Sequence, residues 1–351
     1  MVAARRDATV EDEILILGSL DVAALLAGRD AELIDLIERA YVAHGEGRSS
    51  LPHSTFLRFP GDDANRIIAL PAFLGDGFDV AGMKWIASFP GNVERGIDRA
   101  SAVLILNSCA TGRPEVILEA SLLSARRTAA SAAAAARVLL EGRIPESVGL
   151  LGTGVINLEI ARFLRTAVPG IRRFLIFDLA APRAVGFAVD LRRQLGDVEV
   201  EIAGSAGEML AACRLVSFAT TASRPHVADL SACMPGAVLL HVSLRDLSPA
   251  AILACDNVVD DPDHVCRAQT TMHLAEQLAG NRDFIRCTLA DILSRRAPAR
   301  RGDGSIAVFN PFGLGVLDVA VGRHIAILAR AAGRGVRVES FLPGARKASE
   351  G

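Results

Sequence analysis

Short apolar runs alternate with amphipathic stretches through the second part of the chain. Short apolar runs predict buried strands, and apolar residues spaced three or four apart predict helices. The expected strands are 148–151, 174–177, 198–202, 215–219, 237–241, 257–259 and 305–309. The expected helices are 124–141, one that begins near residue 155, 184–195, 206–213, 263–278, 282–293 and 316–332. This alternation predicts an α/β fold with a doubly wound parallel sheet.

The first third of the chain follows a different pattern, in which strand-like runs are separated by Pro, Gly and Asp clusters. The expected strands are 13–17, 55–59, 66–74, 80–89, 101–106 and 115–118, and the last two are spaced as an antiparallel hairpin. Two helices are expected before residue 46, one capped by Ser19 and one at 30–45. Residues 1–123 are therefore expected to form an α+β domain with a mostly antiparallel sheet.

The sequence V-G-L-L-G-T-G at 148–154 places a glycine turn between an apolar strand and a helix, whose expected inner side includes Val155. Gly152 permits a tight turn, and Gly154 lets the backbone approach a pyrophosphate that a side chain would exclude. The helix directs its free N–H groups and the positive end of its dipole at that phosphate. The pattern predicts a Rossmann-type dinucleotide site.

An acidic residue follows the next expected strand. Asp178 is placed to accept hydrogen bonds from the adenosine ribose hydroxyls, and a carboxylate there repels a 2′-phosphate. NAD is therefore expected rather than NADP, although the nearby Arg183 leaves the strictness of that preference open. The third glycine of the usual motif is replaced by Asn157.

Composition narrows the class of protein. The chain has 351 residues, of which 51% are hydrophobic, and a formal net charge of −2. That balance argues against nucleic acid or a membrane surface as a partner, and no apolar run is long enough to span a bilayer. The six cysteines form no C-x-x-C pair and no zinc spacing, so no metal is expected. A cytoplasmic enzyme is the expectation.

Several polar residues stand where a nicotinamide enzyme needs them. The turn 220–222 follows an expected strand and should line the cofactor cleft. After the next strand, Asp246 is a candidate general acid/base, with His241 as a rival. Lys84 interrupts an apolar strand, where an amine is costly unless it is paired or lies in a polar site. Of Arg126 and Arg127, at the expected start of a helix, one is a candidate for binding an anion.

At these residues the chain resembles the ornithine cyclodeaminase/μ-crystallin family over nearly its whole length. The shared runs are L-I-D-L-I-E-R-A, A-G-M-K-W, T-G-R-P, A-R-R-T-A-A, G-x-G, T-T-A, H-L-A-E and V-F-N-P-F-G. The resemblance implies a Rossmann-type NAD-binding domain, 124–316, inserted in an α+β substrate-binding and dimerisation domain, 1–123, that residues 317–351 complete. It implies that Lys84 and Arg127 hold the substrate carboxylate, that Asp246 is the catalytic acid/base, and that the protein is a homodimer.

Within the family, the runs S-L-P-H-S-T-F-L-R-F, K-W-I-A-S-F-P-G-N, D-R-A-S-A-V-L-I-L-N and H-V-S-L-R-D-L look most like the 2,3-diaminopropionate-forming dehydrogenases of siderophore and peptide-antibiotic pathways. That branch implies NAD-dependent oxidation of N-(1-amino-1-carboxy-2-ethyl)glutamate to an imine, which water hydrolyses to 2-oxoglutarate and L-2,3-diaminopropionate. The implied cofactor contacts are Gly152, Thr153, Gly154, Val155, Ile156, Asp178, Thr220, Thr221, Ala222 and Ser243. Lys84 is implied as a catalytic as well as a substrate-binding residue.

Two departures from the family pattern bear on the substrate. Many members carry a carboxylate-binding arginine where this chain has Ser54, so His53, Arg58 or Arg66 is expected to take that role. The cyclodeaminase loop G-D-C-P-G is R-D-L-S-P at 245–249, which argues against ornithine cyclisation. The alternatives are another amino-acid or ketimine dehydrogenase of the same fold, a cyclodeaminase, and a nucleotide-dependent binding protein without turnover.

Overall fold

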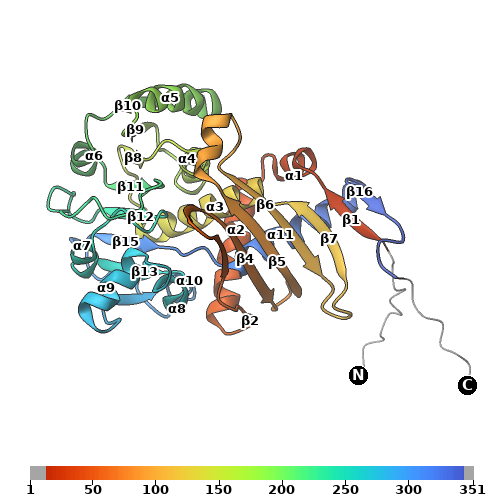
Figure 1. Cartoon of the computed structure of the whole chain (residues 1–351). Helices are drawn as coiled ribbons and strands as arrows, with labels where there is room; N and C mark the ends of the chain where they lie inside the picture. Colours follow the sequence, from red (N-terminus) through yellow and green to blue (C-terminus); the bar gives the residue numbers. More distant parts are fainter. Residues whose placement is uncertain (1–12, 344–351) are drawn as a thin grey trace, which may run out of the picture.

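The computed structural model describes residues 13–343, which contain two eight-stranded sheets. Figure 1 shows one sheet on the right, built mainly from the first third of the chain, and the other on the left. Residues 1–12 and 344–351 lie outside the described residues, and so do the outer ends of the expected segments 1–123 and 317–351.

The first sheet is mostly antiparallel, as the sequence predicted, with the strand order β16-β1-β7-β6-β5-β4-β2 and with β3 paired to β4. The exception is the parallel pairing of β1 with β7. The strands are β1 (Ile14–Leu17), β2 (Ser49–Ser50), β3 (Thr55–Phe59), β4 (Asp62–Leu74), β5 (Val80–Ser88), β6 (Ala100–Asn107), β7 (Pro114–Glu119) and β16 (Val336–Val338). The helices that accompany it are α1 (Ser19–Leu26), α2 (Asp30–Gly45), the 3-10 helix η1 (Pro90–Arg95), α3 (Ser121–Leu139) and α11 (Gly315–Ala332).

The second sheet confirms the doubly wound prediction, because all its neighbouring strands are parallel and their order is β10-β9-β8-β11-β12-β15-β13-β14. The strands are β8 (Val148–Leu151), β9 (Arg173–Phe177), β10 (Glu199–Ile202), β11 (Leu215–Phe218), β12 (Val238–His241), β13 (Asp256–Val259), β14 (Ile285–Thr288) and β15 (Ala307–Asn310). The helices are α4 (Val155–Ala167), α5 (Ala181–Leu195), α6 (Ala206–Ala212), α7 (Pro249–Leu253), α8 (Pro262–Val265), α9 (Thr271–Ala279) and α10 (Leu289–Leu293). The strand order reverses between β8 and β11, which is where ligands bind in open α/β sheets.

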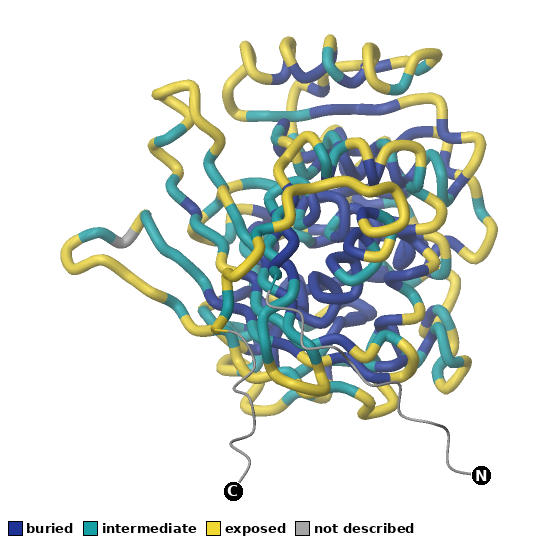
Figure 2. The backbone as a smooth tube through the Cα atoms, turned by 90° about the vertical axis from the view of Figure 1, so that its right-hand side faces the viewer, coloured by how far each residue is buried: buried dark blue, intermediate teal, exposed yellow. Residues whose placement is uncertain are grey.

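The alanine-dense helix α3 joins the two halves of the core. Residues 129–136 are all buried, and the helix packs against α2, α4 and α11 and also contacts β6 of the first sheet and β12 and β15 of the second. Because most of these side chains are single methyl groups, neighbouring helices can approach closely. Figure 2 shows the buried backbone concentrated in the middle of the molecule and the exposed loops around it.

Helix α11 brings the last part of the chain back onto the first sheet, where it packs against β4, β5 and β6. The approach is close at Gly322, where an added Cβ would lie 2.3 Å from Leu104 Cδ2. This packing carries Asp318, in the first turn of α11, into the core beneath β5. No helix within residues 13–343 has the length and apolar character needed to cross a membrane.

Several expected elements were wrong in detail. The single helix expected at 263–278 is two helices, α8 and α9, because Ala268 and Gln269 between them adopt positive φ and Thr270 caps the second helix. The helix expected at 282–293 is the strand β14 followed by α10, because residues from Ile285 pair with β13.

Some expected element ends and side-chain positions were also wrong. Ser19 is the first residue of α1 and Gly18 occupies its N-cap. Val155 is 59% exposed and does not lie on the inner side of α4. Helix α3 begins at Ser121, so Arg126 and Arg127 lie in its second turn and not at its start.

Candidate functional site

The glycine turn between β8 and α4 has the backbone that the motif requires. Gly152 has a φ of 92°, and an added Cβ would lie 2.6 Å from the carbonyl oxygen of Ala219, at the end of β11. An added Cβ on Gly154 would meet nothing within 4 Å. Gly152 is thus required by the close approach of two strands, whereas the space beside Gly154 is open for a ligand.

The first turn of α4 leaves its backbone donors without a side-chain cap. Its N-cap is Gly154, while the N-caps of α6 and α9 are Ser205 and Thr270, whose side chains accept backbone N–H groups. Uncapped N–H groups at a helix start are donors for an anion. The turn therefore fits a pyrophosphate.

Asn157 replaces the third glycine and ties this turn together. Its side-chain amide donates to the carbonyl oxygens of Leu151 and Gly152 at 2.9 and 2.7 Å, and its Oδ1 accepts from Ser217 Oγ at 2.7 Å. The side chain is fully buried and links α4 to both β8 and β11. The departure from the motif therefore preserves the close packing of helix on strand by hydrogen bonds.

Asp178 lies at the end of β9, beside the same turn. Its Oδ2 accepts from the backbone N and the Oγ1 of Thr153 at 3.0 and 2.7 Å, and its Oδ1 accepts from Ala180 N at 2.9 Å. Burial raises the pKa of Asp178, but these hydrogen bonds and the charge of Arg183 bring it below the ordinary value. Asp178 is an ionised acceptor that also fastens the glycine turn.

Asp246 lies in the loop after β12, and its side chain is fully buried. Thr220 Oγ1 donates to its Oδ1 at 2.5 Å, Ser243 Oγ contacts its Oδ2, and His226 Nε2 lies 3.0 Å from Oδ1. Burial raises the pKa of Asp246, but the hydroxyls of Ser243 and Thr220, which donate to its oxygens, hold it below the ordinary value. The structure therefore brings together three residues that the sequence proposed separately: Thr220, Ser243 and Asp246.

His241, the rival candidate, is a buried residue that holds this loop. Its Nδ1 lies 2.9 Å from Asn310 Oδ1, and the amide nitrogen of Asn310 donates elsewhere, to Asn257 and Val308. Nδ1 therefore carries a proton, and Nε2 accepts the backbone N–H of Asp246 at 3.1 Å. With Nε2 as an acceptor, the hydroxyls of Thr220 and Ser243 are the donors to the Asp246 carboxylate.

Lys84 and Arg127 meet at a buried carboxylate that the sequence analysis did not single out. Asp318 Oδ2 lies 2.7 Å from Lys84 Nζ, and its Oδ1 accepts from Arg127 Nε at 2.8 Å. Lys84 Nζ also donates to Ser124 Oγ at 3.1 Å. The pKa of Lys84 is lowered to about 8, first by burial and then by the charge of Arg127, while Asp318 opposes both effects.

Beyond their contacts with Asp318 and Ser124, Lys84 and Arg127 keep hydrogen-bond donors for a second anion. An ammonium group has three donors and a guanidinium has five, and the named partners use two of the three on Lys84 and one of the five on Arg127. Arg126, the other candidate, instead lies beside Glu159 on α4, with Nε 3.8 Å from the carboxylate. Of the two arginines, Arg127 is the one placed beside Lys84.

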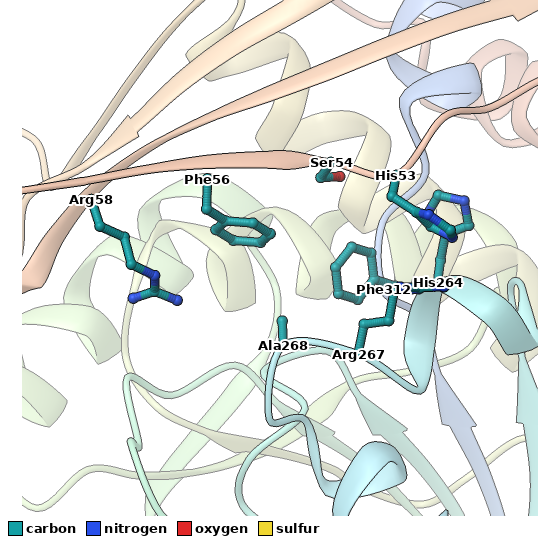
Figure 3. A pocket seen from close by; sticks show the side chains of 8 residues that line it. All are labelled: His53, Ser54, Phe56, Arg58, His264, Arg267, Ala268 and Phe312. Atoms are coloured by element: carbon teal, nitrogen blue, oxygen red, sulfur yellow. The ribbon is translucent and has the colours of Figure 1, made fainter.

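Of the remaining substrate-binding candidates, His53 and Arg58 lie at a cavity of about 200 Å³ between the first sheet and the loop that joins α8 and α9. Its lining consists of His53, Ser54, Phe56, Arg58, His264, Arg267, Ala268 and Phe312. Figure 3 shows Phe56 and Arg58 projecting from β3 toward the side of Ala268 and Arg267. Arg66 on β4 pairs directly across from Arg58. His53 and His264 stack obliquely, with ring centroids 5.1 Å apart.

Sequence reasoning missed Asp318 and His226. A signal for Asp318 was present, because it is an acid within the apolar run Val316–Val321, and the cost of burying a charge that drew attention to Lys84 applies equally to it. His226 gave no signal, since it stands in a polar loop. Within residues 13–343, no group of three or more His, Cys, Asp or Glu side chains is arranged to hold a metal ion.

The doubly wound sheet and glycine turn make this fold one of the nucleotide-binding α/β class. The chain belongs to the ornithine cyclodeaminase/mu-crystallin family, whose model matches residues 15–331. The resemblance seen in the sequence is thereby confirmed.

Three similar proteins place the chain within that family. It is 26% identical over 314 residues, 88% of this chain and 93% of the relative, to N-((2S)-2-amino-2-carboxyethyl)-L-glutamate dehydrogenase of Staphylococcus aureus. It is 26% identical over 345 residues, 94% and 99% of the two chains, to alanine dehydrogenase of Archaeoglobus fulgidus. The crystal structure of CmnK superposes with a TM-score of 0.83 at 29% identity, covering 93% of this chain and 98% of that one.

Proposed function

We propose that this protein is an NAD-dependent oxidoreductase that acts on the CH–NH group of an amino acid. The observation that carries the proposal is the buried carboxylate of Asp246, held at the rim of the sheet that also forms the glycine turn. Two relatives named as dehydrogenases of amino-acid substrates support it. The proposed enzyme has two functional centres, one for the cofactor and one for the carboxylate of the substrate.

The cofactor is proposed to bind along the carboxyl edge of the second sheet. Residues 152–156 would surround its pyrophosphate, in keeping with the uncapped start of α4. Asp178 would bind the hydroxyls of its adenosine ribose. Thr220, Thr221, Ala222 and Ser243 would line the nicotinamide end. NAD supplies the hydride acceptor, and the protein supplies orientation and proton transfer.

Asp246 is proposed to be the general base and acid. Hydride loss from an amine-bearing carbon requires a neutral nitrogen, so a base must take up the proton of the amine, and the carboxylate of Asp246 is proposed as that base. The side chain of His226 is 43% exposed and lies 3.0 Å from Asp246, which gives the buried carboxylate a link to solvent for releasing that proton. The same carboxylate can then accept a proton from the water that attacks the imine.

Lys84 and Arg127 are proposed to bind the carboxylate next to the reacting carbon. Asp318 neutralises part of their charge, so the centre retains one net positive charge when both basic groups are protonated. A substrate carboxylate would balance that charge and use the donors that the protein leaves free. We infer that this pairing fixes which carbon faces the nicotinamide.

The substrate is proposed to be N-(1-amino-1-carboxy-2-ethyl)glutamate. The glutamate α-carbon loses a hydride and the adjoining nitrogen a proton, which leaves a C=N bond. Water adds to that carbon, the C–N bond breaks with proton transfer to nitrogen, and the products are 2-oxoglutarate and L-2,3-diaminopropionate. The similarity to the Staphylococcus aureus dehydrogenase supports this assignment. A homodimer, with residues 1–123 and 317–351 forming its dimerisation domain, completes the proposal.

The test is NADH formation from NAD and this substrate, with the products measured by mass spectrometry. Equal amounts of NADH, 2-oxoglutarate and diaminopropionate support the reaction. Activity on alanine, or on simple 2-oxo acids with ammonia, would replace it with the second candidate, an alanine-type dehydrogenase, which the Archaeoglobus fulgidus relative favours. Bound NAD without turnover on any of these would favour a nucleotide-dependent binding protein.

A further inference from the structure

A row of polar side chains crosses the first sheet beyond the Lys84 centre. Arg58 pairs with Arg66 across β3 and β4, and Arg66 pairs with Ser88 across β4 and β5. Residues directly opposite one another in antiparallel strands project on the same face of the sheet. Arg58, Arg66 and Ser88 therefore share one face, and two like charges stand side by side there.

Two further arginines lie near this row on other segments. Arg245, next to Asp246, donates to the carbonyl oxygen of Ala268 at 2.7 Å, and Ala268 lines the same cavity as Arg58. Arg99 directly precedes Ala100, which pairs with Ser88 across β5 and β6. We call these four residues the arginine cluster: Arg58, Arg66, Arg99 and Arg245.

The members of the arginine cluster are close enough to repel one another. Burial lowers the pKa of Arg66, and the charge of Arg58 lowers it further. Burial likewise lowers the pKa of Arg245, and the charges of Arg66 and Arg58 add to that effect. Burial lowers the pKa of Arg99 as well, and the charge of Arg66 adds to that effect. Like charges gathered in a half-buried place are unfavourable unless an anion balances them.

Among the described side chains, no carboxylate forms an ion pair with any member of the arginine cluster. The hydroxyl of Ser88 is also without a hydrogen-bond partner, although this residue is only 8% exposed. Buried polar atoms are almost always satisfied, so an unsatisfied hydroxyl beside arginines that have no carboxylate partner among the described side chains indicates a ligand-binding place. The ligand chemistry that fits is a carboxylate or another oxyanion.

The position of the row relates it to the proposed active site. Lys84 and Ser88 are four residues apart on β5, so they lie on the same face, roughly 13 Å apart along the strand. One face of the sheet thus carries two cationic centres, and Arg245 connects the second of them to the loop of Asp246. A substrate with carboxylates at both ends could contact both centres.

We propose that the arginine cluster, together with Ser88, is the subsite that binds the remote carboxylates of the substrate and thereby selects long polycarboxylate amino acids over small ones. This inference rests on the proposed function, because it takes Lys84 and Arg127 as the site of the first carboxylate. Guanidinium groups bind carboxylates through paired hydrogen bonds, and a small amino acid has no second carboxylate to use them.

The test measures binding and needs no turnover. The probes are 2-oxoglutarate, with two carboxylates, and pyruvate, with one, titrated by calorimetry into the protein with and without NAD. The variants are Arg66→Gln, Arg66→Lys and Arg245→Gln. The control is Arg193→Gln, which removes the same charge from a side chain that is 77% exposed and paired with Asp190.

We expect the wild type to bind 2-oxoglutarate more tightly than pyruvate. Arg66→Gln should weaken the binding of 2-oxoglutarate roughly ten-fold or more, since one charged hydrogen-bonding group is lost. The affinity for pyruvate should stay nearly unchanged. Arg66→Lys should recover part of the loss, and Arg193→Gln should change neither affinity. Arg66→Gln should unfold no more easily than the wild type in the absence of ligand, because it relieves repulsion within the arginine cluster.

The outcomes separate this inference from the proposed reaction. The subsite is overturned if Arg66→Gln and Arg245→Gln weaken the binding of both probes equally, or weaken the binding of neither. It is also overturned if the wild type does not bind 2-oxoglutarate more tightly than pyruvate. Either result would stand even if the enzyme oxidises its substrate. If the preference depends on Arg66 while the wild type fails to form NADH from N-(1-amino-1-carboxy-2-ethyl)glutamate, the subsite stands and the proposed substrate falls.

Discussion

Two aspartates, Asp318 and Asp246, are both fully buried, yet their surroundings differ in kind. Asp318 lies between two cations, Lys84 and Arg127, at 2.7 and 2.8 Å. Asp246 lies among neutral hydroxyl donors and a partly exposed histidine. The first carboxylate belongs to a fixed network of charges, and the second is held as an anion that can exchange a proton with its neighbours.

The difference shows how burial of a charge should be interpreted. A buried acid between two bases contributes mainly to stability and to the orientation of those bases, because removing it would leave uncompensated charge. A buried acid held by neutral donors and connected to solvent is suited to proton transfer. The predictions below change one of these centres at a time, from the largest expected effect to the smallest.

Asp246→Asn should have the largest effect, and on turnover. We expect kcat to fall by about 10²–10⁴-fold, because the amide cannot accept the proton of the amine. The free energy of unfolding should change little, since the amide oxygen can still accept from Thr220. Steady-state kinetics and calorimetry with NAD measure both properties. A near-normal kcat would remove Asp246 from the role of acid/base, and a loss of NAD binding would make its role structural.

Asp318→Asn should reverse this pattern and act first on stability. It leaves Lys84 and Arg127 buried without a counter-charge, which should cost about 3–5 kcal/mol of unfolding free energy. Urea denaturation measures the loss. Asp190→Asn, which breaks the exposed pair with Arg193, is the control and should cost less than about 1 kcal/mol. A similar small cost for both variants would contradict the proposed importance of the buried network.

Lys84 offers a pH-dependent test of the same network, because the chain contains only two lysines, Lys84 and Lys347. In the variant Lys347→Arg, nitrogen NMR of the single remaining lysine should show a pKa of about 8. The folded pKa lies below the ordinary value of 10.5, so the unfolded chain binds the extra proton between about pH 8 and 10.5. The unfolding free energy should rise with pH in that window, relative to Lys84→Met. An ordinary pKa would contradict the burial of Lys84 in the folded protein.

Asp178→Ala should have the smallest effect, about ten-fold on NAD affinity, with a smaller loss or none for NADP. The reason is that the carboxylate accepts from the ribose of NAD but repels the phosphate of NADP. Thr153→Val is the matched control, because it loosens the turn and keeps the acid. It should weaken both cofactors alike. Equal losses for NAD and NADP in Asp178→Ala would show that Asp178 only fastens the turn.

Much of the second sheet could be predicted from the sequence. Three features of this sheet are local: the strand before Gly152, the helix after Gly154 and the position of Asp178 at the end of β9. Each of them is determined by residues in the same element or in the next element along the chain. Apolar periodicity reports such features directly. It also indicated that Lys84 needed a partner, because the energetic cost of a buried amine does not depend on the fold.

The partners themselves were decided by the tertiary structure. Asp318 lies 191 residues after Arg127 and reaches it only because α11 returns to pack on the first sheet. The arginine cluster likewise joins two adjacent strands, the start of a third and a loop of the other sheet. β14 was missed because a short edge strand is stabilised by pairing with β13 rather than by its own pattern. Sequence periodicity determines which face of an element is buried, but contacts between distant elements depend on how those faces pack. The buried charges could therefore be recognised in the sequence, whereas their pairing could not.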